Sequence, residues 1–178
     1  PLSYRFGASR LRVVPRIKCE TLYAVGGLYG NTLALRAVQE RMAQEERPQD
    51  THAVFNGDFN FFNASPSWWR EVTSAICEGE RLHATLGNVE VEVTGPSSEA
   101  GCGCGYPDYV SDSVVERSNE IVLRLRECVV AAGDDDLLQW VRSLPMGLIA
   151  EVGSEGKRVG IVHGDPDNLA GWGLAVER

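Results

Sequence analysis

The chain has 178 residues, of which 43% are hydrophobic and 24% charged, proportions typical of a folded globular domain and not of a disordered chain. Its formal net charge of −8 at pH 7 argues against a nucleic-acid polymer or an anionic membrane as the main partner, because both would repel it. No apolar run approaches the ~18 residues of a membrane-spanning helix. We therefore expect one domain over residues 1–178 that binds neither a nucleic-acid polymer nor a membrane.

The five cysteines are scattered along the chain, at Cys19, Cys77, Cys102, Cys104 and Cys128. An odd number with this spacing does not fit a disulfide scaffold. No signal peptide is visible at the start of the sequence. These observations favour a reducing compartment, and we expect a cytoplasmic protein.

Compact apolar runs predict the strands of the N-terminal half. Each of the three clearest runs is followed by glycine, which marks a turn. They lie at residues 21–25 (TLYAV), 52–56 (HAVFN) and 83–86 (HATL). We also expect residues 10–14 and 89–94 to be extended.

Helical spacing of apolar residues predicts the helices. The first follows a cap on Asn31 or Thr32 and runs to about residue 47. The second covers residues 66–77, with Pro66 in its first turn. Two more are expected, over residues 114–128 and 134–144.

In the N-terminal half the predicted strands and helices alternate, but in the C-terminal part they do not. Residues 146–152 and 158–162 predict two strands joined by the turn 153–156 (GSEG). The stretch 95–109, rich in Gly, Pro and Ser, predicts a flexible loop. The chain thus reads βαβαβ, then helices, then a hairpin. This order indicates an α/β fold with a parallel sheet and helices on its faces.

Four of the predicted strands are followed closely by Gly27, Asp58, Asn88 and His163. Ligands of such sheets bind beyond the carboxyl ends of the strands, so we expect these residues to meet. A carboxylate, an amide oxygen and an imidazole together suit a divalent cation. Each residue also has a structural explanation, Asp58 as a cap, Asn88 as a turn residue and His163 as a loop histidine.

Four segments, taken in order, resemble the motifs of calcineurin-like metallophosphoesterases, D-x-H-G-N, G-D, G-N-H-[DE] and a late H-G. Here they read Gly27-Leu28-Tyr29-Gly30-Asn31, Gly57-Asp58, Gly87-Asn88-Val89-Glu90 and His163-Gly164. The resemblance covers roughly residues 20–170. It implies a metallophosphoesterase-like αββα sandwich of two mixed sheets flanked by helices.

The resemblance also implies a metal centre. In that family the Asp of G-D bridges two metal ions, and the Asn and the H-G histidine complete part of the shell. Carried over residue by residue, Asp58, Asn88 and His163 would hold divalent manganese, iron or zinc, as one ion or two. Glu90, Asn60 and Asp165 are candidates for an additional ligand, although Glu90 fits equally well as a solvated strand residue.

The substitutions within the motifs are equally informative. Gly27 and Tyr29 stand where the family has its first Asp and His, and Val89 stands where it has the His that faces the leaving group. The chain also stops before the family's final G-H-x-H motif. A conventional two-metal phosphatase is therefore not expected, and no catalytic residue is assigned.

The glycine turn at residues 26–31, which lacks the Asp and His of the family motif, has two interpretations. A glycine turn at a helix N-terminus directs N–H groups outward and can bind phosphate without metal. In that case Gly27, Tyr29, Gly30 and Asn31 form the phosphate site. Alternatively, the turn is only a tight connection with Tyr29 packed over it.

Two further clusters are open to functional or structural interpretation. Cys102 and Cys104 form a C-x-C pair that could bind a soft metal, react with an oxidant, or have no role. Five aromatic residues follow Asp58 and could line a pocket for a flat group or belong to the core or a subunit contact. They are Phe59, Phe61, Phe62, Trp68 and Trp69.

Three hypotheses follow. The first, slightly favoured, is a divergent metal-dependent phosphoesterase acting on a small phosphate mono- or diester, such as a nucleotide. The second is a catalytically inactive module of the same fold that binds a phosphorylated ligand or a protein. The third is that the native product is longer, or that another subunit, for example in a homo-oligomer, covers an open sheet edge.

Overall fold

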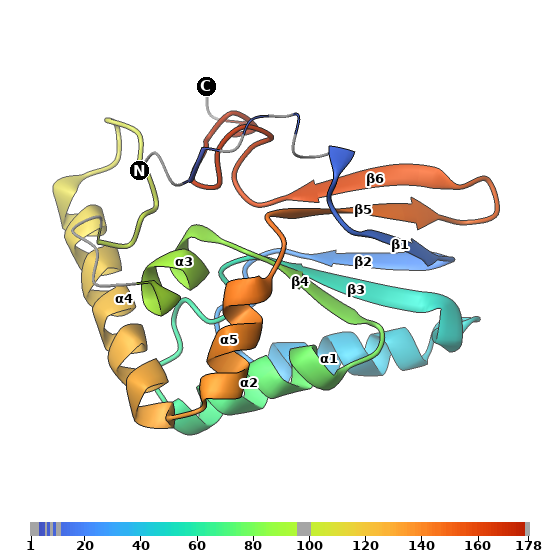
Figure 1. Cartoon of the computed structure of the whole chain (residues 1–178), viewed down its shortest axis with the longest axis horizontal. Helices are drawn as coiled ribbons and strands as arrows, with labels where there is room; N and C mark the ends of the chain where they lie inside the picture. Colours follow the sequence, from blue (N-terminus) through green and yellow to red (C-terminus); the bar gives the residue numbers. More distant parts are fainter. Residues whose placement is uncertain (1–3, 6, 8, 10–11, 96–100, 177–178) are drawn as a thin grey trace.

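The computed structural model describes every residue except 1–3, 6, 8, 10–11, 96–100 and 177–178 (Figure 1). Its strands form two three-stranded sheets. The first has the order β2 (Thr21–Val25), β3 (Thr51–Asn56) and β4 (Leu82–Thr85), all parallel. The second has the order β1 (Arg16–Cys19), β5 (Gly147–Val152) and β6 (Lys157–Val162), with β6 antiparallel to β5.

The helices lie beside the first sheet. Figure 1 shows α1 (Thr32–Ala43) and α2 (Pro66–Glu78) on the face of that sheet that points away from β5 and β6. The helix α3 (Asn88–Thr94) packs against α4 (Asp112–Ala132) and α5 (Asp135–Ser143), and both α4 and α5 pack against α2. A short 3-10 turn, Pro48–Asp50, leads into β3.

Alternation along β3 divides the core in two, since successive side chains of a strand point to opposite faces. Ala53 and Phe55 are fully buried on the helix side. Val54 points the other way and packs against Leu148 and Ile161 of the second sheet. Because both faces are covered, the strand reads as a continuous apolar run in the sequence.

The elements predicted over residues 21–25, 52–56, 66–77 and 114–128 are confirmed, as is the hairpin of β5 and β6. In α2, Trp69, Val72 and Ile76 form the buried face that their spacing predicts. The α/β class is therefore confirmed. Among the described residues, however, only the second sheet is mixed, and no helix covers the outer face of β6, most of which is exposed.

Three local predictions were wrong. The first strand lies at Arg16–Cys19 and not at residues 10–14, of which 10 and 11 lie outside the described residues. The first helix ends at Ala43, four residues earlier than predicted. Residues 89–94 form a helix and not an extended segment. The loop predicted over 95–109 has neither helix nor strand at 101–109, and 96–100 lie outside the described residues.

Tertiary contacts explain why a valine-rich segment becomes the helix α3. The Glu90 side chain accepts a hydrogen bond from the Gly87 N–H at the start of α3, at 2.9 Å. At its end, the Arg142 side chain donates two hydrogen bonds to the Thr94 carbonyl, at 3.0 and 2.7 Å. Since β propensity spans only ~1 kcal/mol, these contacts override the local preference.

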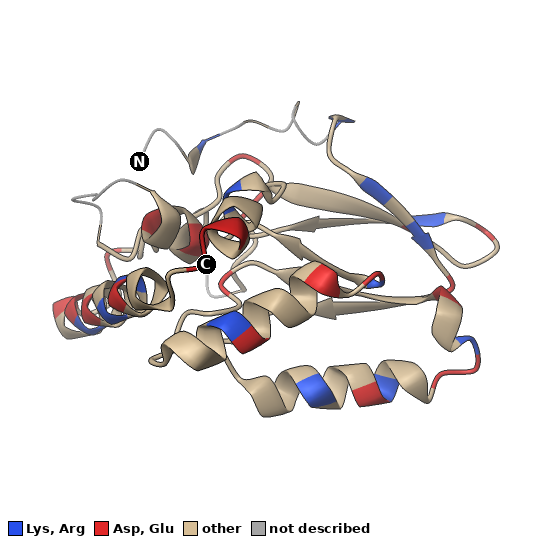
Figure 2. Ribbon diagram, turned by 60° about the horizontal axis from the view of Figure 1, so that its bottom comes forward, with Lys and Arg blue, Asp and Glu red and all other residues tan. Residues whose placement is uncertain are grey.

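Charged side chains are distributed unevenly over the elements. Figure 2 shows lysine and arginine on β1 and β6, whereas every α-helix except the acidic α3 carries both signs. Arg16 and Lys18 of β1 pair with Glu151 of β5 at 3.6 and 3.7 Å. Exposed pairs of this kind contribute at most ~1 kcal/mol each, so they do not decide the fold. Within the described part of the chain, no helix has both the length and the apolar character needed to cross a bilayer.

Candidate functional site

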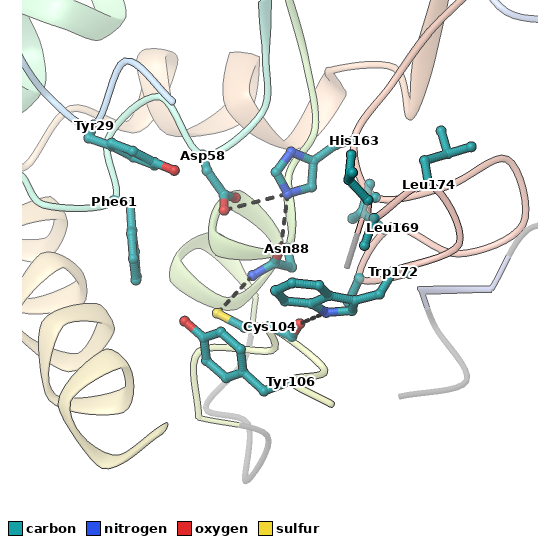
Figure 3. Close-up of a pocket in the computed structure, with 15 residues that line it drawn as sticks. Tyr29, Asp58, Phe61, Asn88, Cys104, Tyr106, His163, Leu169, Trp172 and Leu174 are labelled. Carbon is teal, nitrogen blue, oxygen red and sulfur yellow. Dashed lines mark hydrogen bonds and ion pairs between the residues drawn. The ribbon is translucent and has the colours of Figure 1, made fainter. Parts of the chain in front are cut away.

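Three residues that are distant in the sequence meet at the carboxyl ends of the strands (Figure 3). Asp58 follows β3, Asn88 begins α3 just after β4, and His163 follows β6. The His163 Nε2 atom lies 3.0 Å from Asn88 Oδ1 and 3.5 Å from Asp58 Oδ2. All three line one pocket of about 570 Å³. The structure thus brings together the three residues for which we expected a metal-binding role.

The backbone at this site is strained. Asp58 has a φ of 53° and Tyr29 a φ of 54°, the only two positive values among the described residues other than glycine. Such a conformation costs ~1–3 kcal/mol and persists only where the surroundings enforce it. Here the Asp58 N–H donates to Glu90 Oε2 at 2.7 Å, and Asp58 Oδ1 accepts from the Val89 N–H at 3.1 Å. Both strained residues line the pocket, which supports a functional role for it.

Glu90 is buried behind the turn and does not line the pocket. Its Oε2 atom accepts hydrogen bonds from the N–H groups of Asp58 and Gly87, while Oε1 is buried without a partner. Burial and the nearby Asp58 charge raise the pKa of Glu90 to about 8. The carboxyl group is therefore protonated at neutral pH and holds the turns after β3 and β4 together, a role other than the metal ligand or solvated strand residue we expected.

His163 is held through both ring nitrogens. Nδ1 lies 2.8 Å from the Asn56 carbonyl oxygen, and Nε2 faces Asn88 Oδ1. The Asn88 amide nitrogen donates to the Cys102 carbonyl at 2.9 Å, which fixes Oδ1 on the His163 side. Both ring nitrogens thus face acceptors, and both must carry a proton. Burial alone would lower the pKa of His163, but its hydrogen bond with Asp58 and the charge of that carboxylate raise it to about 9.

The donor set also fits a divalent cation. Ligands ~2.1 Å from one ion lie roughly 3.0–3.4 Å from one another, close to the 3.0 and 3.5 Å measured from His163 Nε2. One imidazole nitrogen and two oxygens suit manganese, iron or zinc. A metal ion would replace the Nε2 proton. Among the described residues, no three His, Cys, Asp or Glu side chains are close enough to share a metal ion. A metal ion at Asp58 and His163 would therefore need the amide oxygen of Asn88 as its third protein ligand.

Aromatic rings form the walls of the pocket. Tyr29 and Phe61 lie on one side with ring centroids 6.0 Å apart, and Tyr106 and Trp172 lie together on another at 5.9 Å (Figure 3). Trp172 is fixed by a hydrogen bond from its Nε1 to the Cys104 carbonyl, 3.1 Å long. The pocket therefore combines a polar floor with flat apolar walls.

Of the five aromatic residues that follow Asp58, only Phe61 lines this pocket. Phe59 and Trp69 are core residues, while Phe62 and Trp68 are about half exposed. Tyr106 and Trp172, which complete the walls, carry no signal in the sequence because they belong to irregular segments.

Two residues proposed as additional ligands have other roles. Asn60 is buried; its amide nitrogen donates to Thr73 Oγ1 at 3.0 Å, and its oxygen accepts from Asn63 at 3.1 Å. Asp165 accepts hydrogen bonds from the N–H groups of three residues in its own loop, Asp167, Asn168 and Gly173. Neither lines the pocket, and the polar atoms of both are engaged within the fold.

In the turn after β2, two of the N–H groups considered for phosphate binding are engaged within the fold. The Gly30 N–H donates to the Phe59 carbonyl at 2.6 Å, and the Asn31 N–H to the Leu28 carbonyl at 3.1 Å. The Asn31 side chain caps α1 by accepting from the Ala34 N–H. A Cβ atom on Gly27 would lie 2.8 Å from the Tyr29 ring. Only Tyr29 of the four predicted residues lines the pocket, through its side chain.

Asn56 is a residue of the site that the sequence pattern did not single out. Its amide nitrogen donates to the Val162 carbonyl at 2.8 Å, and its side-chain oxygen accepts from Thr85 Oγ1 at 3.0 Å. Its backbone carbonyl faces His163 Nδ1. Asn56 thereby joins β3 to β4 and to the end of β6. A polar residue closing an otherwise apolar strand was the available signal.

The titration of Glu90 and His163 predicts that stability falls as the pH rises. The folded pKa values, about 8 and about 9, exceed the ordinary values of 4.5 and 6.5, so the folded state binds more protons than the unfolded state. The contribution of His163 is complete below 6.5 and is lost as the pH passes through about 9. The cost of burying Glu90 grows above 4.5 and is complete above about 8.

We therefore expect the free energy of unfolding, measured in urea with chelator present, to decrease from about pH 5 to about pH 9. Glu90→Gln should flatten the lower part of this dependence. A stability that rises over the same range would contradict the assignment of both protons.

Neither a protein-family model nor a curated protein matches the sequence. Among solved structures, the chain is similar to hypothetical protein PH1004 from Pyrococcus horikoshii OT3, with a TM-score of 0.50 and 14% sequence identity. The superposition covers 84% of this chain and 56% of that one, so the chain spans little more than half the length of that protein. At this identity the similarity concerns the fold alone, and it supports a mixed α/β architecture with two small sheets.

Proposed function

We propose that this chain is a metal-dependent phosphoric ester hydrolase with a remodelled site, a divergent relative of the calcineurin-like metallophosphoesterases. Its substrate would be a small phosphate mono- or diester. The observation that carries the proposal is the convergence of Asp58, Asn88 and His163 at separations suited to one ion. A bound manganese, iron or zinc ion supplies an activated water and polarises a phosphoryl oxygen.

The residues of this chain would bind the cation and position the substrate. Asp58 would supply the negative charge that attracts the cation, and the Glu90 side chain holds the Asp58 backbone by accepting its N–H. Asn88 presents an amide oxygen whose direction is set by the Cys102 carbonyl. Tyr29 directs its hydroxyl toward Asp58 (Figure 3), and burial raises its pKa, so it stays a hydrogen-bond donor for a phosphoryl oxygen. Phe61 and Trp172 would offer flat apolar surfaces to the substrate.

Metal binding by calorimetry tests the proposal. Chelator-treated protein is expected to bind one manganese or zinc ion and to release a proton, because His163 must give up its Nε2 proton. His163→Gln should weaken the affinity about 100-fold or more. The matched control is His83→Gln, because His83 is paired with His52 through a 2.8 Å hydrogen bond and does not line the pocket. Equal affinities of wild type and His163→Gln would contradict a metal role for His163.

A second candidate is a module that binds a phosphorylated ligand without hydrolysing it. It is favoured by the way the protonated His163 ring satisfies Asp58 and Asn88 without an ion. The replacement of the first-motif ligands by Gly27 and Tyr29 and of the third-motif His by Val89 agrees with it. Binding of inorganic phosphate that depends on His163, in the absence of metal and without turnover of any ester, would favour this candidate.

A further inference from the structure

The loop 101–105, Gly-Cys-Gly-Cys-Gly, folds back on itself beside the pocket. Its three glycines have φ values of 62°, 67° and 55°, a conformation that residues with a Cβ rarely adopt. At Gly103 the close approach of Tyr4 and Glu92 also excludes a side chain. The result is a tight turn that brings Cys102 and Cys104 together. The Cys104 N–H donates to Cys102 Sγ at 3.3 Å, and Cys104 Sγ lies 3.7 Å from the Cys102 carbonyl oxygen.

The two sulfurs differ in access. Cys102 is only 3% exposed, whereas Cys104 is half-buried and lines the pocket. The Cys104 thiol is therefore the more accessible of the two to a small reagent in the pocket. The other three cysteines lie on separate elements, Cys19 on β1, Cys77 on α2 and Cys128 on α4. All five are free thiols.

The loop is linked to the floor of the pocket through Asn88. The Asn88 amide nitrogen donates to the Cys102 carbonyl at 2.9 Å and to Cys104 Sγ at 3.5 Å (Figure 3). Its oxygen faces His163 Nε2 at 3.0 Å. A disulfide, with an S–S bond of about 2.0 Å, would draw Cys104 Sγ toward Cys102 and away from Asn88.

We infer that Cys102 and Cys104 form a peroxide-sensitive dithiol whose oxidation is transmitted through Asn88 to His163. A hydroperoxide loses its O–O bond when one of the two sulfurs, as its thiolate, takes one oxygen, which gives a sulfenic acid and an alcohol or water. The other sulfur then attacks the sulfenic sulfur, the S–S bond forms and water leaves. The two thiols lose two electrons and two protons, and the hydroperoxide accepts them. This inference does not depend on the proposed hydrolase activity.

Treatment of the reduced full-length chain with one equivalent of hydrogen peroxide tests both parts. The intact mass should fall by the mass of two hydrogen atoms. After alkylation, Cys19, Cys77 and Cys128 should carry the label, and the peptide with Cys102 and Cys104 should not. In histidine ¹H–¹⁵N spectra the His163 signal should shift, while His52 and His83 serve as internal references.

Cys104→Ser should abolish both the mass change and the shift, and the matched variant Cys128→Ser should retain them. A mass gain of oxygen at Cys104 without an S–S bond would overturn the dithiol. An S–S bond that leaves the His163 signal unshifted would overturn the coupling through Asn88. Both readouts are made on the wild-type chain, so they decide the question even if a variant folds poorly.

Discussion

Asp58→Asn is expected to reduce metal-dependent hydrolysis of an aryl phosphate diester by on the order of 10²–10³-fold or more, because it removes the only charge that the three converging residues offer a cation. The shape of the site should survive. Asparagine tolerates a left-handed φ such as the 53° at this position, and its Oδ1 can still accept from the Val89 N–H. The loss would therefore report on charge and not on folding.

Steady-state kinetics with added manganese measure this effect, and Glu155→Gln is the matched control because Glu155 lies exposed in the turn between β5 and β6. The same substitution of Asp58 should lower the pKa of His163 below about 9, since Asp58 contributes most among the groups that raise it. If Asp58→Asn hydrolysed the diester as fast as the wild type, the active site would have to lie outside this pocket. Phosphate binding without turnover in the wild type would favour the inactive module.

Gly87→Ala is expected to lower the free energy of unfolding substantially. A Cβ atom there would lie 2.5 Å from the Asp58 backbone nitrogen and 2.7 Å from Glu90 Oε2, and it would also collide with the Asp58 carboxylate. The neighbours cannot move without breaking the hydrogen bonds by which Glu90 joins the two turns. Overpacking of this kind costs roughly 1–3 kcal/mol, and more where the contacts are with backbone.

Urea unfolding checks this prediction, with Gly160→Ala as the control. Gly160 lies on β6, and no atom lies within 4 Å of the position that the added methyl group would take, so alanine should be neutral or slightly stabilising there. The midpoint for Gly87→Ala should fall while the denaturant slope stays constant, as expected for a change in stability alone. Similar midpoints for the two variants would show that the turn relaxes more easily than its contacts indicate.

Under the proposed relationship to the metallophosphoesterases, Tyr29 would stand at the position of a metal-binding His and Gly27 at that of the Asp. The Tyr29 ring lies so close to Gly27 that a Cβ atom there would be 2.8 Å from it. The turn keeps its connection to the rest of the fold through the hydrogen bond from Gly30 to Phe59. Its remaining contribution to the pocket is an aromatic wall with one hydroxyl group.

The sequence alone determined the parts of this protein that depend on local pattern. Buried strands such as β3 are continuous apolar runs, and the apolar face of α2 follows its helical spacing. The meeting of Asp58 and Asn88 could also be predicted, because the parallel strands β3 and β4 deliver their carboxyl ends to the same edge. These features need only short-range periodicity and the rule that places ligands at strand ends. His163 reaches Asp58 and Asn88 from β6, an antiparallel strand of the other sheet, so its position depends on how the two sheets pack.

Only the tertiary structure decided the remainder, because it rests on contacts between residues far apart in the chain. The Glu90 side chain is buried and accepts a hydrogen bond from the Asp58 N–H, 32 residues earlier in the chain. The helix α3 is stabilised at its end by the hydrogen bond from Arg142 to the Thr94 carbonyl. Trp172 reached the pocket wall through the carbonyl of Cys104. No local pattern encodes such partners, since each contact forms only after the two sheets and the helices have packed together.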